Sequence, residues 1–248
     1  MKILKTITVY VLLLLFNSNL QARPIISGIS TNEINIDTKF TGAEILLFGA
    51  KDDSGDVIIV IRGPKKDYRI NKKGKVIGIW HNQKRLKFKD TYSYYSFFST
   101  NQKTKSSDRI IRNLEIGKKN IDFNMSGKVK EYEKNDFKVE FTKILESKEL
   151  YLTNSDKIDF LDETLFKVML KFPKNISSGV YTVEIYLIDD NNLSAFQAIP
   201  IYVNQVGFSA KINNMAYQNS IIYAILAILI AVIAGWFANF AFNRFFGK

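Results

Sequence analysis

The sequence predicts a mostly β protein, with one or two β-sandwich (immunoglobulin-like) modules followed by a single C-terminal transmembrane helix. Short runs of branched and apolar residues, separated by turn residues, fill the middle of the chain. An uncharged apolar stretch occupies positions 221–242. A shorter apolar run behind two lysines opens the chain. We therefore expect a signal peptide at 1–22, an N-terminal β-rich periplasmic domain at 23–126, a second β-sandwich-like domain with a short leading helix at 127–212, and a transmembrane helix with a short cytoplasmic tail at 213–248.

The first 22 residues have the parts of a secretory signal. Lys2 and Lys5 form its basic region, positions 7–16 form an apolar region, and Ala22 ends a cleavage site. Ten helical residues at about 1.5 Å each reach only half of a hydrocarbon core of about 30 Å. The short leader favours a cleaved signal over a retained anchor, which is the alternative, and we expect the mature chain to begin at Arg23.

The N-terminal half shows strand patterns at 33–37, 43–50, 56–63, 75–80 and 91–100. The polar stretch 52–56 is typical of a hairpin loop, and 71–74 is typical of a turn. A serine followed by apolar residues at helical spacing predicts a short helix from Ser106.

The second half begins with a helix pattern at 129–149, in which apolar residues recur amid charges. Short strand patterns then follow at spacings of 10–15 residues, as in a sandwich. The segment 172–188 is similar to the closing hairpin of many immunoglobulin-like modules, because a loop with proline and glycine leads into an alternating strand.

Positions 221–242 are long enough to cross a membrane, since 22 helical residues span about 33 Å. Tyr217 and Tyr223 mark one interface, and Trp236 and Phe237 mark the other. Export of the N-terminus would leave Arg244 in the cytoplasm, in agreement with the positive-inside rule.

The alanines of this segment form a stripe with spacings of 3, 4, 3, 4 and 3 residues. Small residues let two helices approach closely in lipid, and a period of 3.5 residues indicates a left-handed crossing. We interpret the stripe as a packing face for a second transmembrane helix, from another copy or another protein; the alternative is that alanine is merely tolerated there. The residues are Ala224, Ala227, Ala231, Ala234, Ala238 and Ala241.

The chain carries a net charge of +11, and basic residues are dense from Arg62 to Lys89. Such a run fits an anionic lipid or wall polymer, while nucleic acid is not expected outside the cytoplasm. A solvated strand face, or a lysine-rich composition without selection for binding, is the alternative. The residues that we single out for anion binding are Lys65, Lys66, Arg69, Lys72, Lys73, Lys84, Arg85 and Lys87.

The sequence contains few residues that could form a catalytic site. The chain has no cysteine and one histidine, His81, which stands beside Trp80 without a recognisable partner. The acidic loop 52–56 departs from the EF-hand pattern, because Val57 and Gly63 stand where glycine and glutamate are needed. We predict no catalytic, cofactor-binding or metal site and no enzyme activity. A catalytic Ser-Lys pair is the alternative that the sequence leaves open.

Several stretches resemble one known family, the alphaproteobacterial putative transmembrane proteins of uncharacterised function. They are 29–50, 56–64, 75–80, 160–168 and 172–188, followed by the glycine and phenylalanine at 207–208 and the C-terminal helix. The resemblance covers nearly the whole mature chain. It implies a signal sequence, an envelope-facing domain and one C-terminal span in the inner membrane, and it brings no catalytic residues.

These observations together predict a single-pass protein of the cell inner membrane with periplasmic N-terminal domains. We expect a non-catalytic accessory or assembly subunit of an inner-membrane complex, with a second transmembrane helix as its partner. The alternative is a module that binds an anionic envelope polymer or lipid headgroups through its basic ectodomain.

Overall fold

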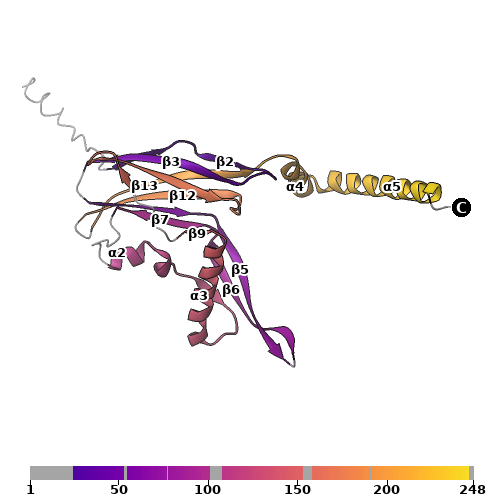
Figure 1. The fold of residues 1–248 in the computed structure, drawn as a ribbon, viewed down its shortest axis with the longest axis horizontal. Helices are drawn as coiled ribbons and strands as arrows, with labels where there is room; N and C mark the ends of the chain where they lie inside the picture. The colour runs from indigo at the N-terminus through magenta and orange to yellow at the C-terminus, as the bar shows by residue number, and fades with distance from the viewer. Residues whose placement is uncertain are drawn as a thin grey trace, which may run out of the picture.

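A computed structural model describes residues 25–52, 55–76, 78–100, 108–152, 158–189 and 192–245. The leader expected at 1–22 lies outside these residues, as do Asp53 and Ser54 of the acidic loop and Ser106, the expected helix start. The described chain is mostly β, with several sheets and one long apolar helix at its C-terminal end, which confirms the predicted fold class (Figure 1).

Sheet A has four strands in the order β1 (Ile25–Ile29), β3 (Gly42–Lys51), β11 (Leu165–Pro173) and β10 (Asp159–Phe160), all antiparallel. β11 alternates between buried and exposed residues, as its sequence pattern predicts. Phe166, Val168, Leu170 and Phe172 are buried, whereas the intervening residues reach solvent. Sheet A therefore has one face on the core and one face in water.

Sheet B has six strands in the order β2 (Glu33–Ile36), β13 (Asn192–Gln205), β12 (Gly179–Asp189), β4 (Asp56–Arg62), β7 (Tyr95–Ser99) and β9 (Tyr151–Leu152). β4 is central, and its residues from Val57 to Arg62 are all buried. A continuous run of branched side chains suits a strand that is covered on both faces. β4 is therefore the centre of the core.

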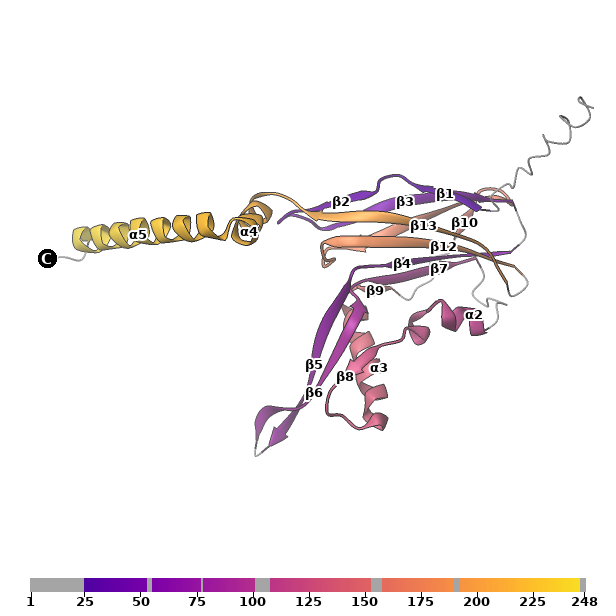
Figure 2. The ribbon, with the colours of Figure 1, turned by 180° about the vertical axis from the view of Figure 1, so that it is seen from behind.

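The two sheets pack on each other as layers (Figure 2). The Phe172 ring of sheet A lies 5.9 Å from the Tyr181 ring of sheet B, and the Tyr94 ring contacts both. At the edge, the Gln197 side chain of β13 accepts from the Ser27 backbone N–H and donates to the Ser27 carbonyl, both at 2.9 Å. Sheets A and B thus enclose one shared core.

The sheets differ from the sequential domains expected on either side of position 126. β3 pairs with β11, β4 pairs with β12, and β2 runs parallel to β13, so both sheets combine strands from the two halves. β3 and β4 belong to different sheets, so they do not form the hairpin that was expected around 52–56. β11 and β12 also belong to different sheets, so the closing hairpin expected at 172–188 is not formed. Local patterns reveal strands, but they carry no information about distant pairing partners.

Two segments, from β4 to β7 and from β7 to β9, form an excursion from these layers. β5 (Lys65–Val76), β6 (Ile79–Tyr92) and β8 (Asn124–Ser126) make the antiparallel sheet C. Helices α2 (Asp108–Asn113), η1 (Lys118–Asn120) and α3 (Glu131–Ser147) accompany it. α2 and α3 confirm the two helices predicted in this region, whereas the turn expected at 71–74 is wrong, because β5 continues through it.

The chain leaves the sheets through α4 (Phe208–Gln218) and α5 (Ser220–Phe245). Gly207 precedes α4 with a φ of 88°, a left-handed conformation that glycine adopts without strain. α4 turns the chain from β13 into α5, and α5 projects away from the layers (Figure 1).

Candidate functional site

Helix α5 is the first candidate functional element. Ser220–Arg244 is the single helix, within the described ranges, that is long and apolar enough to cross a membrane, and none of it is buried in the protein. Its 25 residues span about 38 Å at ~1.5 Å each. A helix that is apolar on all sides over most of its length, and that its own protein does not cover, needs an apolar solvent, and a bilayer supplies one.

The predicted alanine stripe lies on α5. Spacings of three and four residues place the six alanines on one helix face. All are exposed except Ala241, which is half-buried. Gly235 lies beside this face, and a Cβ added there would meet nothing within 4 Å. The helix thus has room for close approach by a second helix, and the role of the stripe stays a prediction.

The second candidate is the long hairpin of β5 and β6. Tyr68 and Phe88 pack on Phe141 of α3, with ring centroids 5.2 and 4.3 Å apart, so this face is an aromatic core of its own. The same alternation turns Arg69, Arg85 and Lys87 to the opposite face. The hairpin therefore has an apolar face against α3 and a basic face away from it.

Like charges face each other across this hairpin. Arg69 is directly opposite Lys87, and Lys72 is directly opposite Lys84. Such pairs oppose strand association, so folding alone does not favour them. Each pair has a single carboxylate partner within the described residues: Asp67 binds Lys87 at 2.7 Å, and Glu133 of α3 binds Lys84.

Both carboxylates are held in their charged form. The Lys87 ammonium and the backbone N–H of Asp90 lower the pKa of Asp67 below its ordinary value. Lys84 and, more weakly, Lys72 lower the pKa of Glu133. These two carboxylates offset one positive charge in each opposed pair, and the hairpin retains an excess of positive charge.

A pocket of about 490 Å³ lies on the basic face. Its described lining contains five basic residues and no carboxylate. Asn71 and Ser126 add neutral polar side chains to it. We call it the basic pocket; its basic residues are Arg69, Lys84, Arg85, Lys87 and Lys128.

The structure brings together only part of the predicted anion-binding set. Lys65 and Lys66 lie at the base of the hairpin, where Lys65 sits 5.1 Å from the Tyr92 ring, and Lys73 lies toward the tip, opposite Asn82. Lys128 was not predicted, because it comes next to the hairpin only through the pairing of β8 with β6. Chain position alone gives no signal for it.

Arg62, the first member of the basic run, is not on this surface. It is 8% exposed and forms an ion pair with Glu184 of β12, and it donates to the Leu114 carbonyl. Its role is internal, since a buried cation next to a carboxylate joins β4 to β12 and the excursion. The side chains of Trp80 and His81 lie outside the described part of the structure.

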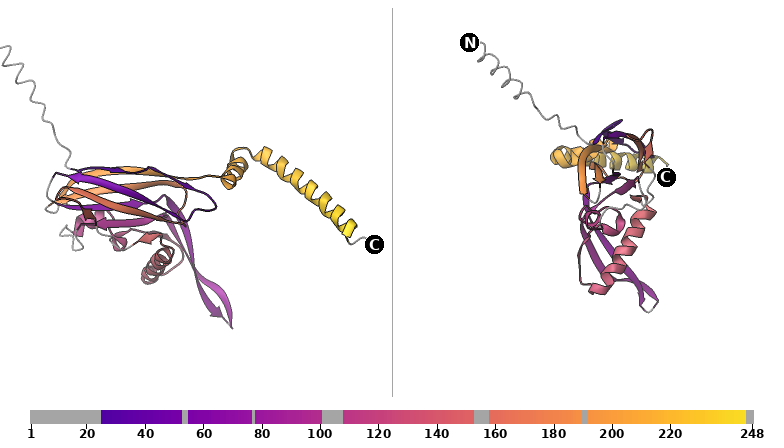
Figure 3. Two further views of the ribbon diagram at one scale, coloured as in Figure 1. Left: turned by 45° about the horizontal axis from the view of Figure 1, so that its top comes forward. Right: turned by 90° about the vertical axis from the view of Figure 1, so that its left-hand side faces the viewer.

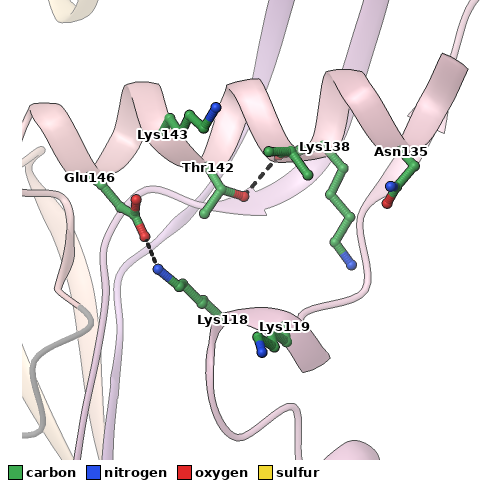
Figure 4. Close-up of a pocket in the computed structure, with 8 residues that line it drawn as sticks. Lys118, Lys119, Asn135, Lys138, Thr142, Lys143 and Glu146 are labelled. Carbon is green, nitrogen blue, oxygen red and sulfur yellow. Dashed lines mark hydrogen bonds and ion pairs between the residues drawn. The ribbon is translucent and has the colours of Figure 1, made fainter.

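A second pocket, of about 340 Å³, lies between α3 and η1 (Figure 4). Its lysines are largely engaged: Lys118 binds Glu146, Lys143 binds Glu140 at 2.9 Å, and Lys138 donates to the Ile121 carbonyl at 3.0 Å. The Lys118 and Lys138 contacts fasten α3 to η1 and to the residue that follows it. The pocket therefore offers a bound anion less free charge than the basic pocket does.

Acidic and histidine side chains are the candidate metal ligands of this chain. No group of three or more His, Asp or Glu side chains that could hold a metal ion occurs among the residues that the structure describes. The predicted absence of such sites stays a prediction.

The fold and α5 define a membrane-anchored protein with a β-rich body. A family model described as "Putative transmembrane protein (Alph_Pro_TM)" matches residues 24–244, so the chain belongs to this family. No curated protein matches the chain, and no solved structure matches it. The immunoglobulin-like character of the sheets therefore stays a prediction.

Proposed function

We propose that this protein is a non-catalytic accessory or assembly subunit of an inner-membrane complex, held to that complex by α5. The observation that carries the proposal is an apolar helix with no cover from its own protein and with one face of small side chains. In lipid, helix association depends on close packing along such faces. The partner is a second transmembrane helix, from another copy of the chain or from another membrane protein.

Asn239 adds a polar argument for a partner. It accepts a hydrogen bond from Asn243 at 3.3 Å, on the same helix. Its own amide N–H groups face a region where unsatisfied donors are costly, and a neighbouring helix can accept from them. The amide and the alanines both favour association of α5 over its isolation in lipid.

The proposed topology follows the charges and the leader. Cleavage of residues 1–22 would leave the sheets in the periplasm, with Arg244 at the cytoplasmic end of α5. A reporter that is active only in the cytoplasm, fused after Lys248, should be active. If that reporter is inactive and a periplasmic reporter at the same position is active, the orientation is the opposite of the one proposed.

The helix proposal is tested by crosslinking and pull-down of the intact protein from its native membrane. Ala227→Leu, Ala231→Leu and Ala234→Leu together enlarge the small face, and we expect the recovered partner or dimer to fall about tenfold. The matched control is Ile222→Leu, Ile225→Leu and Ile233→Leu, which changes the opposite face and should leave recovery unchanged. Equal recovery from both variants would mean that the alanine stripe is only composition.

A second candidate function is binding of an anionic envelope polymer or lipid headgroups by the hairpin. The basic pocket favours it, because five basic residues line it and three of them have no ion pair within the described residues. The two candidates involve different parts of the chain, so the α5 variants should leave anion binding intact.

A further inference from the structure

The basic hairpin and the membrane helix extend from the same end of the packed sheets. In Figures 1 and 2, β5 and β6 leave the layers at the end from which α4 and α5 project. The left view of Figure 3 shows the same arrangement from a further direction. In Figures 1 and 2 the hairpin lies between α3 and the end from which α5 projects, so its face turned away from α3 is on the side of a bilayer that contains α5.

The cations of the basic pocket are only partly neutralised. Lys84 and Lys87 have carboxylate partners, whereas Arg69, Arg85 and Lys128 have no ion pair within the described residues. Guanidinium groups bind phosphate oxygens through paired N–H donors, and a lysine adds a further charge. Asn71 and Ser126 supply neutral hydrogen-bonding groups beside them. This combination fits a phosphate group.

Helix α4 gives an independent indication of where the lipid surface lies. Phe208 is 78% exposed and Ile212 is 40% exposed, and helical spacing places both on one face with Met215. Exposed Lys211 flanks that face. A short amphipathic helix that continues directly into a spanning helix is suited to the headgroup boundary, with its apolar face toward the acyl chains.

We infer that the basic pocket docks on anionic phospholipid headgroups of the membrane that α5 spans, while α4 lies in the interface beside it. The inference rests on the second candidate function and names its ligand. The protein then makes three contacts with one bilayer: α5 spans the bilayer, α4 lies along the interface, and the hairpin rests against the surface. These contacts hold the sheets in a fixed orientation relative to the membrane.

A lipid is favoured over a soluble polymer because of the tether. α5 holds the hairpin next to the bilayer, so headgroups are present at a high effective concentration and weak individual contacts suffice. Juxtamembrane basic residues gain additively from an anionic surface, within a Debye length of about 8 Å at physiological salt. A free polymer has neither advantage.

The test uses the full chain in lipid nanodiscs. Since the sequence has no cysteine, Lys73→Cys introduces a single thiol near the hairpin tip for an environment-sensitive fluorophore. A headgroup-labelled lipid serves as the quencher. We expect quenching to be about twofold stronger with roughly 30% phosphatidylglycerol than with phosphatidylcholine alone, and to fall again at about 0.5 M salt.

Two matched triple variants assign the effect to the pocket. Arg69→Gln, Arg85→Gln and Lys128→Gln remove three cations while leaving the Lys84 and Lys87 ion pairs in place, and should abolish the dependence on phosphatidylglycerol. The control removes the same charge elsewhere and should retain that dependence: Lys148→Gln, Lys167→Gln and Lys174→Gln, all exposed. Circular dichroism and thermal unfolding check that both variants fold.

Several results would overturn the inference. Quenching that is equal with and without phosphatidylglycerol would remove the lipid ligand. If soluble polyphosphate binds the labelled protein in phosphatidylcholine nanodiscs while phosphatidylglycerol has no effect, the ligand is a polymer and anion binding itself survives. If neither anion changes the signal in a folded protein, the second candidate function fails as well.

Discussion

At the scale of single residues, the buried Arg62 contacts several elements at once. Its guanidinium pairs with Glu184, donates to the Leu114 carbonyl and lies 5.6 Å from the Tyr92 ring. These partners belong to β12, to the segment after α2 and to β6. One buried side chain therefore connects sheet B to the excursion that carries the hairpin.

We expect Arg62→Ala to lower the free energy of unfolding by about 3 kcal/mol, because it leaves the Glu184 charge and the Leu114 carbonyl without their partner. Chemical unfolding of the full chain in nanodiscs measures the change. Lys66→Ala removes an exposed cation nearby and should alter stability by less than about 0.5 kcal/mol. Similar losses for the two variants would contradict the structural role of Arg62.

At the scale of the elements, Gly49 permits the close packing of β3 between β1 and β11. A Cβ at this position would lie 2.5 Å from the Phe166 ring and 2.9 Å from the Ile26 carbonyl. The ring is fully buried and the carbonyl belongs to a paired strand, so neither can move away readily. The absence of a side chain is what lets sheet A close here.

Gly49→Ala should therefore destabilise the protein by about 1–3 kcal/mol through overpacking. Gly28→Ala, in the neighbouring strand β1, is the matched control. Its Cβ would meet the ring of the exposed Phe48 at 3.1 Å, and that ring can turn toward solvent. The midpoints of unfolding of the two variants measure the difference in stability. A larger loss of stability for Gly28→Ala than for Gly49→Ala would contradict the described packing.

The sequence was informative about elements and uninformative about their partners. The branched run of β4, the alternation of β11 and the charged amphipathic pattern of α3 are local features, so each could be recognised from its own residues. The pairing of β4 with β12 depends on contacts between distant segments, and no residue in either strand identifies the other.

The hairpin shows the same limit at the candidate site. Asn71–Gly74 has the composition of a turn, yet these residues continue β5, because each of them pairs with a residue of β6 and Tyr68, just before them, packs on α3. The basic run was visible as composition. Only the folded structure, with the register of β5, β6 and β8, shows that Arg62 is internal, that two lysines form ion pairs, and that other basic residues line one pocket.

At the scale of the whole molecule, buried tyrosines join the separate sheets. The Tyr94 hydroxyl donates to the Lys171 carbonyl of β11 at 2.6 Å, and Tyr151 of β9 donates to the Tyr92 carbonyl of β6 at 2.9 Å. Burial raises the pKa of both phenols, and it raises the pKa of Tyr181 to about 12. The folded state thus holds these protons more tightly than the unfolded chain does.

This arrangement predicts loss of stability at alkaline pH. The raised pKa values contribute stability that is complete below the ordinary tyrosine pKa of 10.0 and is lost as the pH rises toward 12. Phenolate absorbance and circular dichroism should therefore change together for the buried tyrosines. Tyr181→Phe should weaken the dependence on pH, and ionisation of the buried phenols without unfolding would contradict the prediction.

The interleaving of distant strands in sheets A and B has a consequence for biogenesis. β2, β3 and β4 are synthesised first, but their partners β13, β11 and β12 come near the end of the chain, immediately before α4 and α5. β4 can pair early with β7, but its apolar run lacks β12 until then, and such non-local pairing is slow to form. Maturation of the ectodomain and delivery of the anchor to the bilayer thus become nearly simultaneous events, and a chain cut short before β11 lacks the strands that complete sheets A and B.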